Sequence, residues 1–262
     1  VYFEQGNIGA AFRVIPLKPP VIDQMDLPPV MKKLALERQG LVLVTGPTGS
    51  GKSTTLASMV EFINTTKDVH VLTIEDPVEF IYTNKKSVVT QRELGADTLT
   101  YPNAIKYALR QDPDVILIGE MRDQETILAA VKAAETGHLV MSTMHTTDCV
   151  GTVSRIISTF PPHEQDGIRQ RLGMILRGAI SQRLVPRCDR PGRIPALDLL
   201  IVTPTAKDAI LKDRVDDLYD LIHHGAYDGM RSMNQSLLHH LMAGVIDFDT
   251  AMSYSENPAQ LI

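Results

Sequence analysis

Short apolar runs alternate with helix-forming stretches along the middle of the chain. The apolar runs are short enough to be buried strands, over residues 41–45, 69–75, 115–118 and 139–144. The stretches between them are predicted to be helices, over residues 53–63, 103–110 and 124–136. This alternation predicts an α/β fold, with a mostly parallel sheet and crossover helices on both faces. Ligands bind to such sheets at the carboxyl ends of the strands.

The pattern changes on both sides of this region. Residues 8–15 alternate as a strand does, and the prolines that follow, at positions 16, 19, 20, 28 and 29, exclude a helix or a central strand. We therefore expect an interdomain linker over residues 16–29, then a short helix over residues 31–38. Beyond residue 146 we expect helices over residues 150–158 and 163–177, strands over residues 180–185 and 194–202, and a largely helical region from residue 205.

Composition narrows the class of protein. The 262 residues, 44% of them hydrophobic, can bury a large core, and no apolar run approaches the roughly 18 residues needed to span a bilayer. The net charge of -5 gives no basic field, so we expect no nucleic-acid partner. Cys149 and Cys188 stand far apart and predict neither a zinc site nor a disulfide framework, which suits a reducing, cytoplasmic setting. Because Val1 already belongs to a strand-like segment, we expect that preceding residues are missing.

A complete phosphate-binding loop lies between the strand at residues 41–45 and the helix that follows it. Its glycines allow a tight turn whose backbone N–H groups point inward, and the helix adds the positive end of its dipole. Lys52 is expected to reach the β- and γ-phosphates of ATP, and the Ser53 hydroxyl to ligate Mg²⁺. The residues predicted to hold the nucleotide are Gly46, Pro47, Thr48, Gly49, Ser50, Gly51, Lys52, Ser53 and Thr54.

Two carboxylates flank the strand at residues 115–118. Asp114 opens this strand and Glu120 closes it, about 20 Å further along at roughly 3.3 Å per residue. Only Glu120 can therefore reach the phosphate edge, and we expect it to hold Mg²⁺ through water or to polarise the attacking water.

A second acidic group follows the strand at residues 69–75. Glu75, Asp76 and Glu79 meet at the edge where a hydrolytic ATPase needs a general base. Glu79 is the first candidate for positioning water, and Glu75 and Asp76 could serve the metal or the adenosine side. The alternative is a solvated acidic loop.

Histidines and arginines supply further candidates. His138 and His145 bracket the fourth strand, about 23 Å apart in an ideal strand, so they cannot share one phosphate. His145 could contact the γ-phosphate, whereas His138 is expected to order the opposite end or an interface. Arg13, Arg92 and Arg110 are candidates for an arginine that completes a neighbouring subunit's site, with surface salt bridges as the alternative.

Together these motifs resemble the secretion ATPase superfamily, most closely the type IV pilus retraction ATPases of the PilT and PilU kind. The matching segments run in order through nearly the whole chain, at residues 46–56, 72–80, 91–93, 108–123, 134–140, 144–147 and 181–184. The resemblance implies a Walker A loop at residues 46–54, an acidic box with Glu79 as the catalytic glutamate, a Walker B glutamate at Glu120, a histidine box at His138 and His145, and in Arg13 an arginine acting across an interface.

The same resemblance implies a domain organisation and a partner set. Residues 30–203 would be a RecA-like ATPase domain, preceded by the end of a PAS-like domain at 1–15 and a linker at 16–29, and followed by a helical subdomain at 204–262. Six subunits would form a ring, with nucleotide bound between domains. ATP hydrolysis with Mg²⁺ would move the ring, and the ring would act on a platform protein at the cytoplasmic side of the inner membrane. Pilin subunits would then leave the base of the pilus. A related retraction ATPase is a further expected partner.

Two sequence features indicate to which branch of the superfamily the chain is similar. Assembly and type II secretion ATPases usually carry a four-cysteine zinc insert after the segment resembling residues 181–185, and here only Cys188 stands in that region. Retraction enzymes often carry an Ala-Ile-Arg-Asn-Leu-Ile-Arg-Glu stretch, where this chain has different residues at 205–212. We expect a retraction motor. The alternatives are an accessory retraction paralogue, an assembly or secretion ATPase, a non-hydrolysing regulatory paralogue, and a nucleic-acid translocase, which the acidic composition does not favour.

Overall fold

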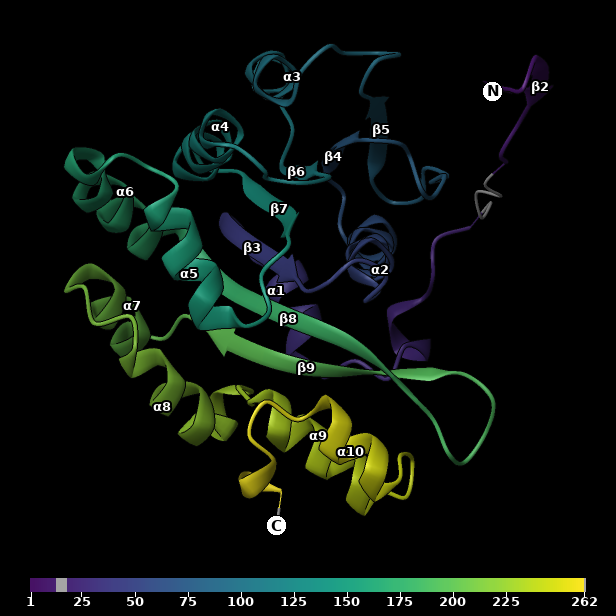
Figure 1. Cartoon of the computed structure of the whole chain (residues 1–262). Coiled ribbons are helices and arrows are strands. Elements are labelled where there is room, and N and C mark those ends of the chain that lie inside the picture. Colours follow the sequence, from purple (N-terminus) through teal and green to yellow (C-terminus); the bar gives the residue numbers. More distant parts are fainter. Residues whose placement is uncertain (13–17, 262) are drawn as a thin grey trace.

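The computed structural model describes residues 1–12 and 18–261, and within them a seven-stranded sheet forms the centre of the molecule (Figure 1). Its strand order is β5-β4-β6-β7-β3-β8-β9. The strands are β3 (Gly40–Thr45), β4 (His70–Glu75), β5 (Val88–Glu93), β6 (Val115–Ile118), β7 (Leu139–Met144), β8 (Leu176–Pro186) and β9 (Arg193–Ile201). All neighbouring pairs are parallel except β8 with β9. The predicted mostly parallel sheet is therefore confirmed.

The register of the strands brings their carboxyl ends to one edge. Thr45 at the end of β3 pairs with Met144 at the end of β7, and Ile118 at the end of β6 pairs with Ile74 of β4. Each of these strands is thus followed by a loop at the same edge of the sheet. This edge is where ligands of parallel sheets bind.

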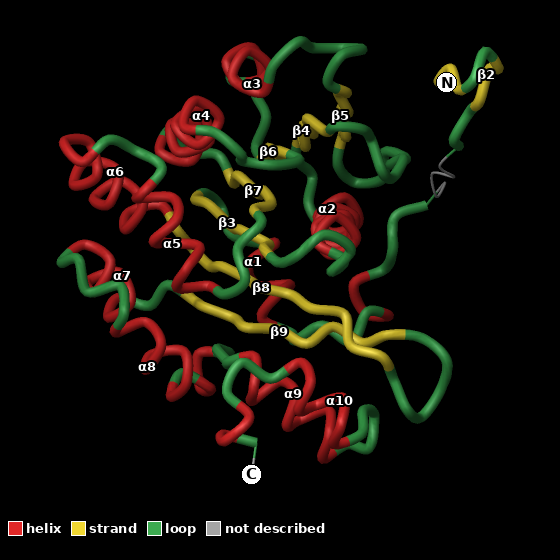
Figure 2. The backbone as a smooth tube through the Cα atoms, in the orientation of Figure 1, coloured by secondary structure: helices red, strands yellow, loops and turns green. Residues whose placement is uncertain are grey.

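Helices cover both faces of the sheet (Figure 2). One face carries α1 (Val30–Ala35) and α2 (Lys52–Thr66), and the other carries α3 (Tyr101–Ala108), α4 (Gln124–Glu135), α5 (Cys149–Ser158) and α6 (Pro162–Ile175). Strand β3 shows how the sequence separates the two cores, because Leu41 and Leu43 pack on one side and Val42 and Val44 on the other. Each fully buried side chain of this kind contributes about 1.5–3 kcal/mol.

The region after β9 is helical, as predicted. It contains α7 (Pro204–Leu211), α8 (Asp217–His224), α9 (Met233–Met242) and α10 (Phe248–Tyr254), with 3₁₀ turns η2 (Ala226–Asp228) and η3 (Pro258–Gln260). Helix α9 begins with a capping box, in which Ser232 and Gln235 satisfy each other's backbone N–H groups. Met233 and Leu237 pack with Val185 and Ile194 of the β8–β9 hairpin. None of the helices in the described residues is both long and apolar enough to cross a membrane.

The N-terminal segment corrects the strand predicted over residues 8–15. β1 (Tyr2–Glu4) and β2 (Asn7–Gly9) form an antiparallel hairpin, and residues 10–12 are not in a strand. Gln5 and Gly6 both have positive φ, 49° and 79°, which is the backbone that a two-residue hairpin turn requires. The rest of the predicted strand and the first linker residues lie outside the described residues. In the linker region that follows, η1 (Ile22–Gln24) buries Ile22 against the core.

Strand β5 was not predicted, and it forms one edge of the sheet. It pairs with β4 alone, and two of its N–H groups that point away from β4 are satisfied by side chains. The Val89 N–H donates to Asn84 Oδ1 (3.0 Å), and the Glu93 N–H donates to Asp97 Oδ2 (2.8 Å). Side chains from the two loops beside β5 thus take the place of a further strand.

Candidate functional site

The phosphate-binding loop joins β3 to α2, as the sequence predicts. Gly46, Gly49 and Gly51 have φ values of 136°, 79° and 90°, in the region that glycine adopts without strain. Helix α2 begins at Lys52, and its N-cap residue Gly51 makes no side-chain capping bond. The first N–H groups of the helix are therefore left without a capping side chain, as at an anion-binding helix terminus.

Lys52 is folded back onto the loop. Its Nζ donates hydrogen bonds to the carbonyl oxygens of Gly46 (2.9 Å) and Pro47 (3.0 Å), and the residue is 8% exposed. Burial lowers the pKa of Lys52, and the nearby charges of Glu120 and Glu79 oppose this shift. The ammonium group therefore contacts the loop and is influenced by the charges of two carboxylates from other segments.

Glu120 follows β6 and shares one carboxylate oxygen between the Arg122 guanidinium and the His145 imidazole. Arg122 Nε lies 2.7 Å and His145 Nε2 lies 3.1 Å from Glu120 Oε1. Burial raises the pKa of Glu120, but the Arg122 hydrogen bond and the charge of His145 outweigh burial and lower it overall. Thr143 Oγ1 donates to Gly119 O (2.7 Å), so the end of β6 is tied to β7 beside this carboxylate. The Glu120 side chain is thus ionised and fixed in place.

The acidic segment at the end of β4 contains Glu75, which is buried, Asp76, which is exposed, and Glu79, which is half-buried. Glu75 is buried and accepts hydrogen bonds from Thr73 Oγ1 (2.7 Å), Gln91 Nε2 (3.2 Å) and the Glu79 backbone N–H (3.5 Å). Burial raises the pKa of Glu75, and these hydrogen bonds oppose the rise. Glu75 therefore orders the turn, while Asp76 and Glu79 extend from it toward the cleft.

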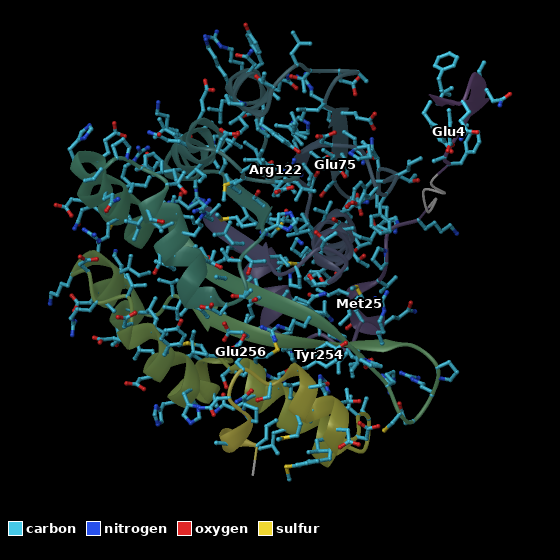
Figure 3. All side chains as sticks on the ribbon, in the orientation of Figure 1. Glu4, Met25, Glu75, Arg122, Tyr254 and Glu256 are labelled. Carbon is cyan, nitrogen blue, oxygen red and sulfur yellow. The ribbon has the colours of Figure 1, made fainter. Side chains whose placement is uncertain are left out.

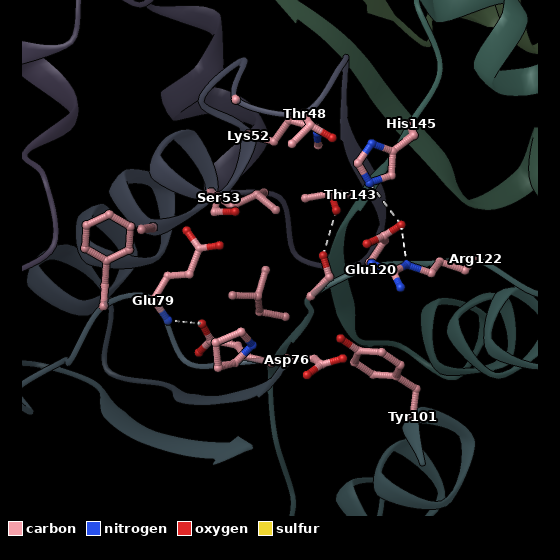
Figure 4. A pocket seen from close by; sticks show the side chains of 18 of the residues that line it. Thr48, Lys52, Ser53, Asp76, Glu79, Tyr101, Glu120, Arg122, Thr143 and His145 are labelled. Atoms are coloured by element: carbon pink, nitrogen blue, oxygen red, sulfur yellow. Dashed lines mark hydrogen bonds and ion pairs between the residues drawn. The ribbon is translucent and has the colours of Figure 1, made fainter. Parts of the chain in front are cut away.

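These groups surround one cleft of about 350 Å³ at the carboxyl edge of the sheet (Figure 4). Figure 4 shows the side chains of Glu79 and Glu120 on two sides of the cleft, with Lys52 and Ser53 between them. The predicted site residues that line it are Thr48, Gly49, Lys52, Ser53, Glu75, Asp76, Glu79, Glu120 and His145. The rest of the loop, Gly46, Pro47, Ser50, Gly51 and Thr54, is not among the residues that line the cleft.

Other predicted residues lie elsewhere. His138 precedes β7 at the opposite end of the strand from His145, with Nδ1 2.9 Å from Ala133 O of α4, so it does not line the cleft within this chain. Asp114 is likewise at the far edge, where Oδ2 accepts the His70 N–H (2.9 Å). Arg13 lies outside the described residues. Cys149 is buried on α5 and Cys188 is exposed, and both are free.

Several residues in the cleft were not predicted from the sequence. Arg122 stands two positions after Glu120, a signal that could have found it. Tyr101 comes from α3, and its pKa is raised to about 12 by burial and then by Asp76 and Glu120. No local pattern marks Tyr101 or Thr143, since helix and strand bring them to the cleft from distant parts of the chain.

The donor set fits a nucleoside triphosphate with Mg²⁺. A Cβ built on Gly49 would meet nothing within 4 Å, so the loop faces open space in the cleft. Among the described residues no cluster of three or more His, Cys, Asp or Glu side chains is arranged to hold a metal. Mg²⁺ bound with a nucleotide needs only one or two protein oxygens besides phosphate and water, and Ser53 and Glu120 offer these. Lys52 and Ser53 thus line the same cleft as several carboxylates, and the cleft can hold phosphate groups.

Comparison with known proteins agrees with this arrangement. The sequence profile of the family described as Type II/IV secretion system protein matches residues 24–237. The chain belongs to the type II/IV secretion system protein family. The match includes the phosphate loop, both acidic segments and His145.

Relatives within the type II/IV secretion system family share most of this chain. It is 45% identical over 248 residues to a twitching motility protein of Neisseria gonorrhoeae, covering 95% of this chain and 66% of that protein. It is 44% identical over 250 residues to the type IV pilus retractation ATPase PilT of Pseudomonas aeruginosa, covering 95% and 72%. A crystal structure of the pilus retraction motor PilT with bound ADP superimposes with a TM-score of 0.92 at 44% identity, covering 98% and 73%. The chain therefore has the RecA-like fold expected, and spans 66–73% of the length of these proteins.

Proposed function

We propose that the chain is the ATP-hydrolysing motor part of a type IV pilus retraction ATPase. The observation that carries the proposal is the convergence of Lys52, Glu79 and Glu120, from three separate segments, on one cleft beside a complete phosphate loop. Relatives named for retraction and twitching motility match almost the whole chain, which supports the same conclusion.

Each group has a distinct task in the proposed reaction. The loop N–H groups and Lys52 bind the β- and γ-phosphates and stabilise charge as the terminal phosphoryl group leaves. Glu79 orients the attacking water and accepts its proton. Ser53 and Glu120 would hold Mg²⁺, which neutralises phosphate charge when bound. Arg122 and His145 keep the Glu120 carboxylate ionised and aimed into the cleft.

The proposal extends to assembly and partners. A homohexamer, with Arg13 among the residues reaching a neighbouring subunit, would act at the cytoplasmic face of the inner membrane on a pilus platform protein, alone or with a related retraction ATPase. His138, at the opposite edge of the sheet from the cleft, is available to a nucleotide only across such an interface.

Within the described residues β8 continues into β9 through a short connection at residues 187–192. This connection has no room for a zinc insert, which favours retraction over assembly.

The test measures ATP turnover in the purified Glu120→Gln variant and pilus number and twitching motility in the host cell. Glu120→Gln should retain ATP binding and lose most ATP turnover, because the amide keeps the shape of the side chain but not its charge. In cells that lack the gene, excess pili with lost twitching motility, restored by the wild-type gene but not by Glu120→Gln, are expected. Bald cells would instead indicate assembly or secretion. Full turnover in Glu120→Gln would contradict the assigned role.

A further inference from the structure

A single side chain of β8 holds the phosphate-binding loop from outside the cleft. Gln182 is 1% exposed, and its Nε2 donates a hydrogen bond to Ser50 O (2.7 Å). Its Oε1 accepts a hydrogen bond from Thr55 Oγ1 of α2 (2.8 Å). Thr55 is fully buried as well. One buried amide therefore links the loop to the first turn of the helix that follows it.

The strand register explains why Gln182 reaches the loop. Thr45, the last residue of β3, pairs with Ser181 of β8, so Gln182 continues alongside Gly46 where β3 has ended. A Cβ built on Gly46 would lie 2.3 Å from Gln182 O, and one on Gly51 would lie 2.7 Å from Gln182 Nε2. The loop thus packs directly on Gln182. At Gly46 the close atom is backbone, and both glycines have positive φ, which glycine adopts without strain.

Holding the Ser50 carbonyl also sets the direction of the next N–H group. In a trans peptide the C=O and the following N–H point in opposite directions. Because Ser50 O points to Gln182, the N–H of Gly51 points away from Gln182. In such loops the backbone N–H groups bind phosphate. Loss of the Gln182 bond would remove one restraint on the peptide between residues 50 and 51, while the Ser50 N–H to Pro47 O and Thr55 N–H to Gly51 O bonds remain.

We propose that Gln182 is a positioning residue for the nucleotide, which fixes the peptide between Ser50 and Gly51 in its phosphate-binding orientation. The inference rests on the proposed nucleotide-binding function of the cleft. Gln182 does not line the cleft, so it acts through the loop and not by touching the nucleotide.

The strand that carries Gln182 is itself anchored on both sides. Ser181 Oγ donates to Thr147 O (2.7 Å), in the loop that begins with His145. Arg183 donates to Tyr254 O (3.0 Å) and Glu256 Oε1 (2.8 Å) in the C-terminal region, and Figure 3 labels these two residues beside the hairpin. The residues on both sides of Gln182 are therefore tied to other parts of the structure.

The test measures ADP affinity by calorimetry in the purified protein. Gln182→Met keeps the length of the side chain and removes both hydrogen bonds, and it should weaken ADP binding about tenfold. Gln182→Glu places a carboxylate against Ser50 O and should weaken binding at neutral pH. At lower pH the protonated carboxyl can donate to Ser50 O, so its affinity relative to wild type should recover as the pH falls.

Two further measurements distinguish a positioning role of Gln182 from a general effect on stability. They are ADP binding by matched Thr55 variants and amide hydrogen exchange. Thr55→Ser keeps the donor to Gln182 and should bind ADP as wild type does, whereas Thr55→Val should bind it more weakly. In the protein without nucleotide, exchange at residues 46–52 should be faster in Gln182→Met. A folded Gln182→Met with wild-type affinity and wild-type exchange would overturn the inference. If wild type binds no ADP, the proposed function fails, and the exchange measurement still decides whether Gln182 holds the loop.

Discussion

Asp198 provides a quantitative test of how the buried carboxyls respond to pH. It lies on β9, is 5% exposed, and its Oδ2 accepts the backbone N–H of Cys149 at the start of α5 (2.7 Å). Burial raises the pKa of Asp198 to about 6, the hydrogen bonds from Cys149 oppose the rise, and the charges of Glu256 and Asp148 add to it. Asp198→Asn keeps the oxygen acceptor and removes the charge.

The direction in which stability changes with pH follows from proton binding. The pKa of Asp198 is higher in the folded chain than its ordinary value of 3.8, so the folded state binds more protons between these pH values. The free energy of unfolding therefore decreases as the pH rises through this range. A shift of about two units corresponds to about 3 kcal/mol in total, of which about 2 kcal/mol falls between pH 4.5 and 7.

The assay is urea unfolding of wild type and Asp198→Asn at several pH values. The unfolding free energy of wild type minus that of the variant should decrease by about 2 kcal/mol from pH 4.5 to 7. Asp68→Asn, at an exposed position, serves as the control for removing a surface carboxylate. A wild-type-minus-Asp198→Asn difference that stays constant with pH would refute the reasoning.

Further predictions concern the cleft and its loop. Lys52→Ala should weaken ADP binding roughly 10- to 100-fold by calorimetry, because a charge-assisted contact is lost; unchanged affinity would exclude its phosphate role. Gly51→Ala places a Cβ 2.7 Å from Gln182 Nε2 at a φ of 90°, so ADP affinity and the thermal midpoint should both fall, and a neutral result in both would contradict the packing. Arg122→Gln removes the hydrogen bond that lowers the pKa of Glu120, so the acidic limb of the pH–rate profile for ATP turnover should move to higher pH; an unmoved limb would separate Arg122 from the titration of Glu120.

Much of the sheet and of the cleft could be predicted because their signals are local. Buried strands are short apolar runs, and the loop at residues 46–54 combines glycine spacing with a strand before it and a helix after it. Glu79 and Glu120 follow strands whose carboxyl ends must meet in a parallel sheet. The structure places both in the cleft, while their catalytic roles stay a prediction.

Some features were not predicted because their signal in the sequence is weak or because they depend on contacts between residues far apart in the sequence. β5 carries Thr90, Gln91, Arg92 and Glu93 because it lies at an edge, so it lacks the apolar run of an inner strand. Gln182 was noted only within a family motif, since its contact with Ser50 spans 132 positions. The hairpin at the N-terminus was missed because its turn, Gln5-Gly6, is a weak signal beside the longer alternation that follows.

The side chains that satisfy two outer N–H groups of β5 limit strand addition at this edge of the sheet. An exposed strand with free backbone groups is a template onto which another chain can add a strand. Asn84 and Asp97 occupy that position on Val89 and Glu93, so these two N–H groups are not available to a strand of another chain. Removing these two side chains would leave the N–H groups of Val89 and Glu93 without their side-chain acceptors at the edge of the sheet, which is the condition under which a further strand can add.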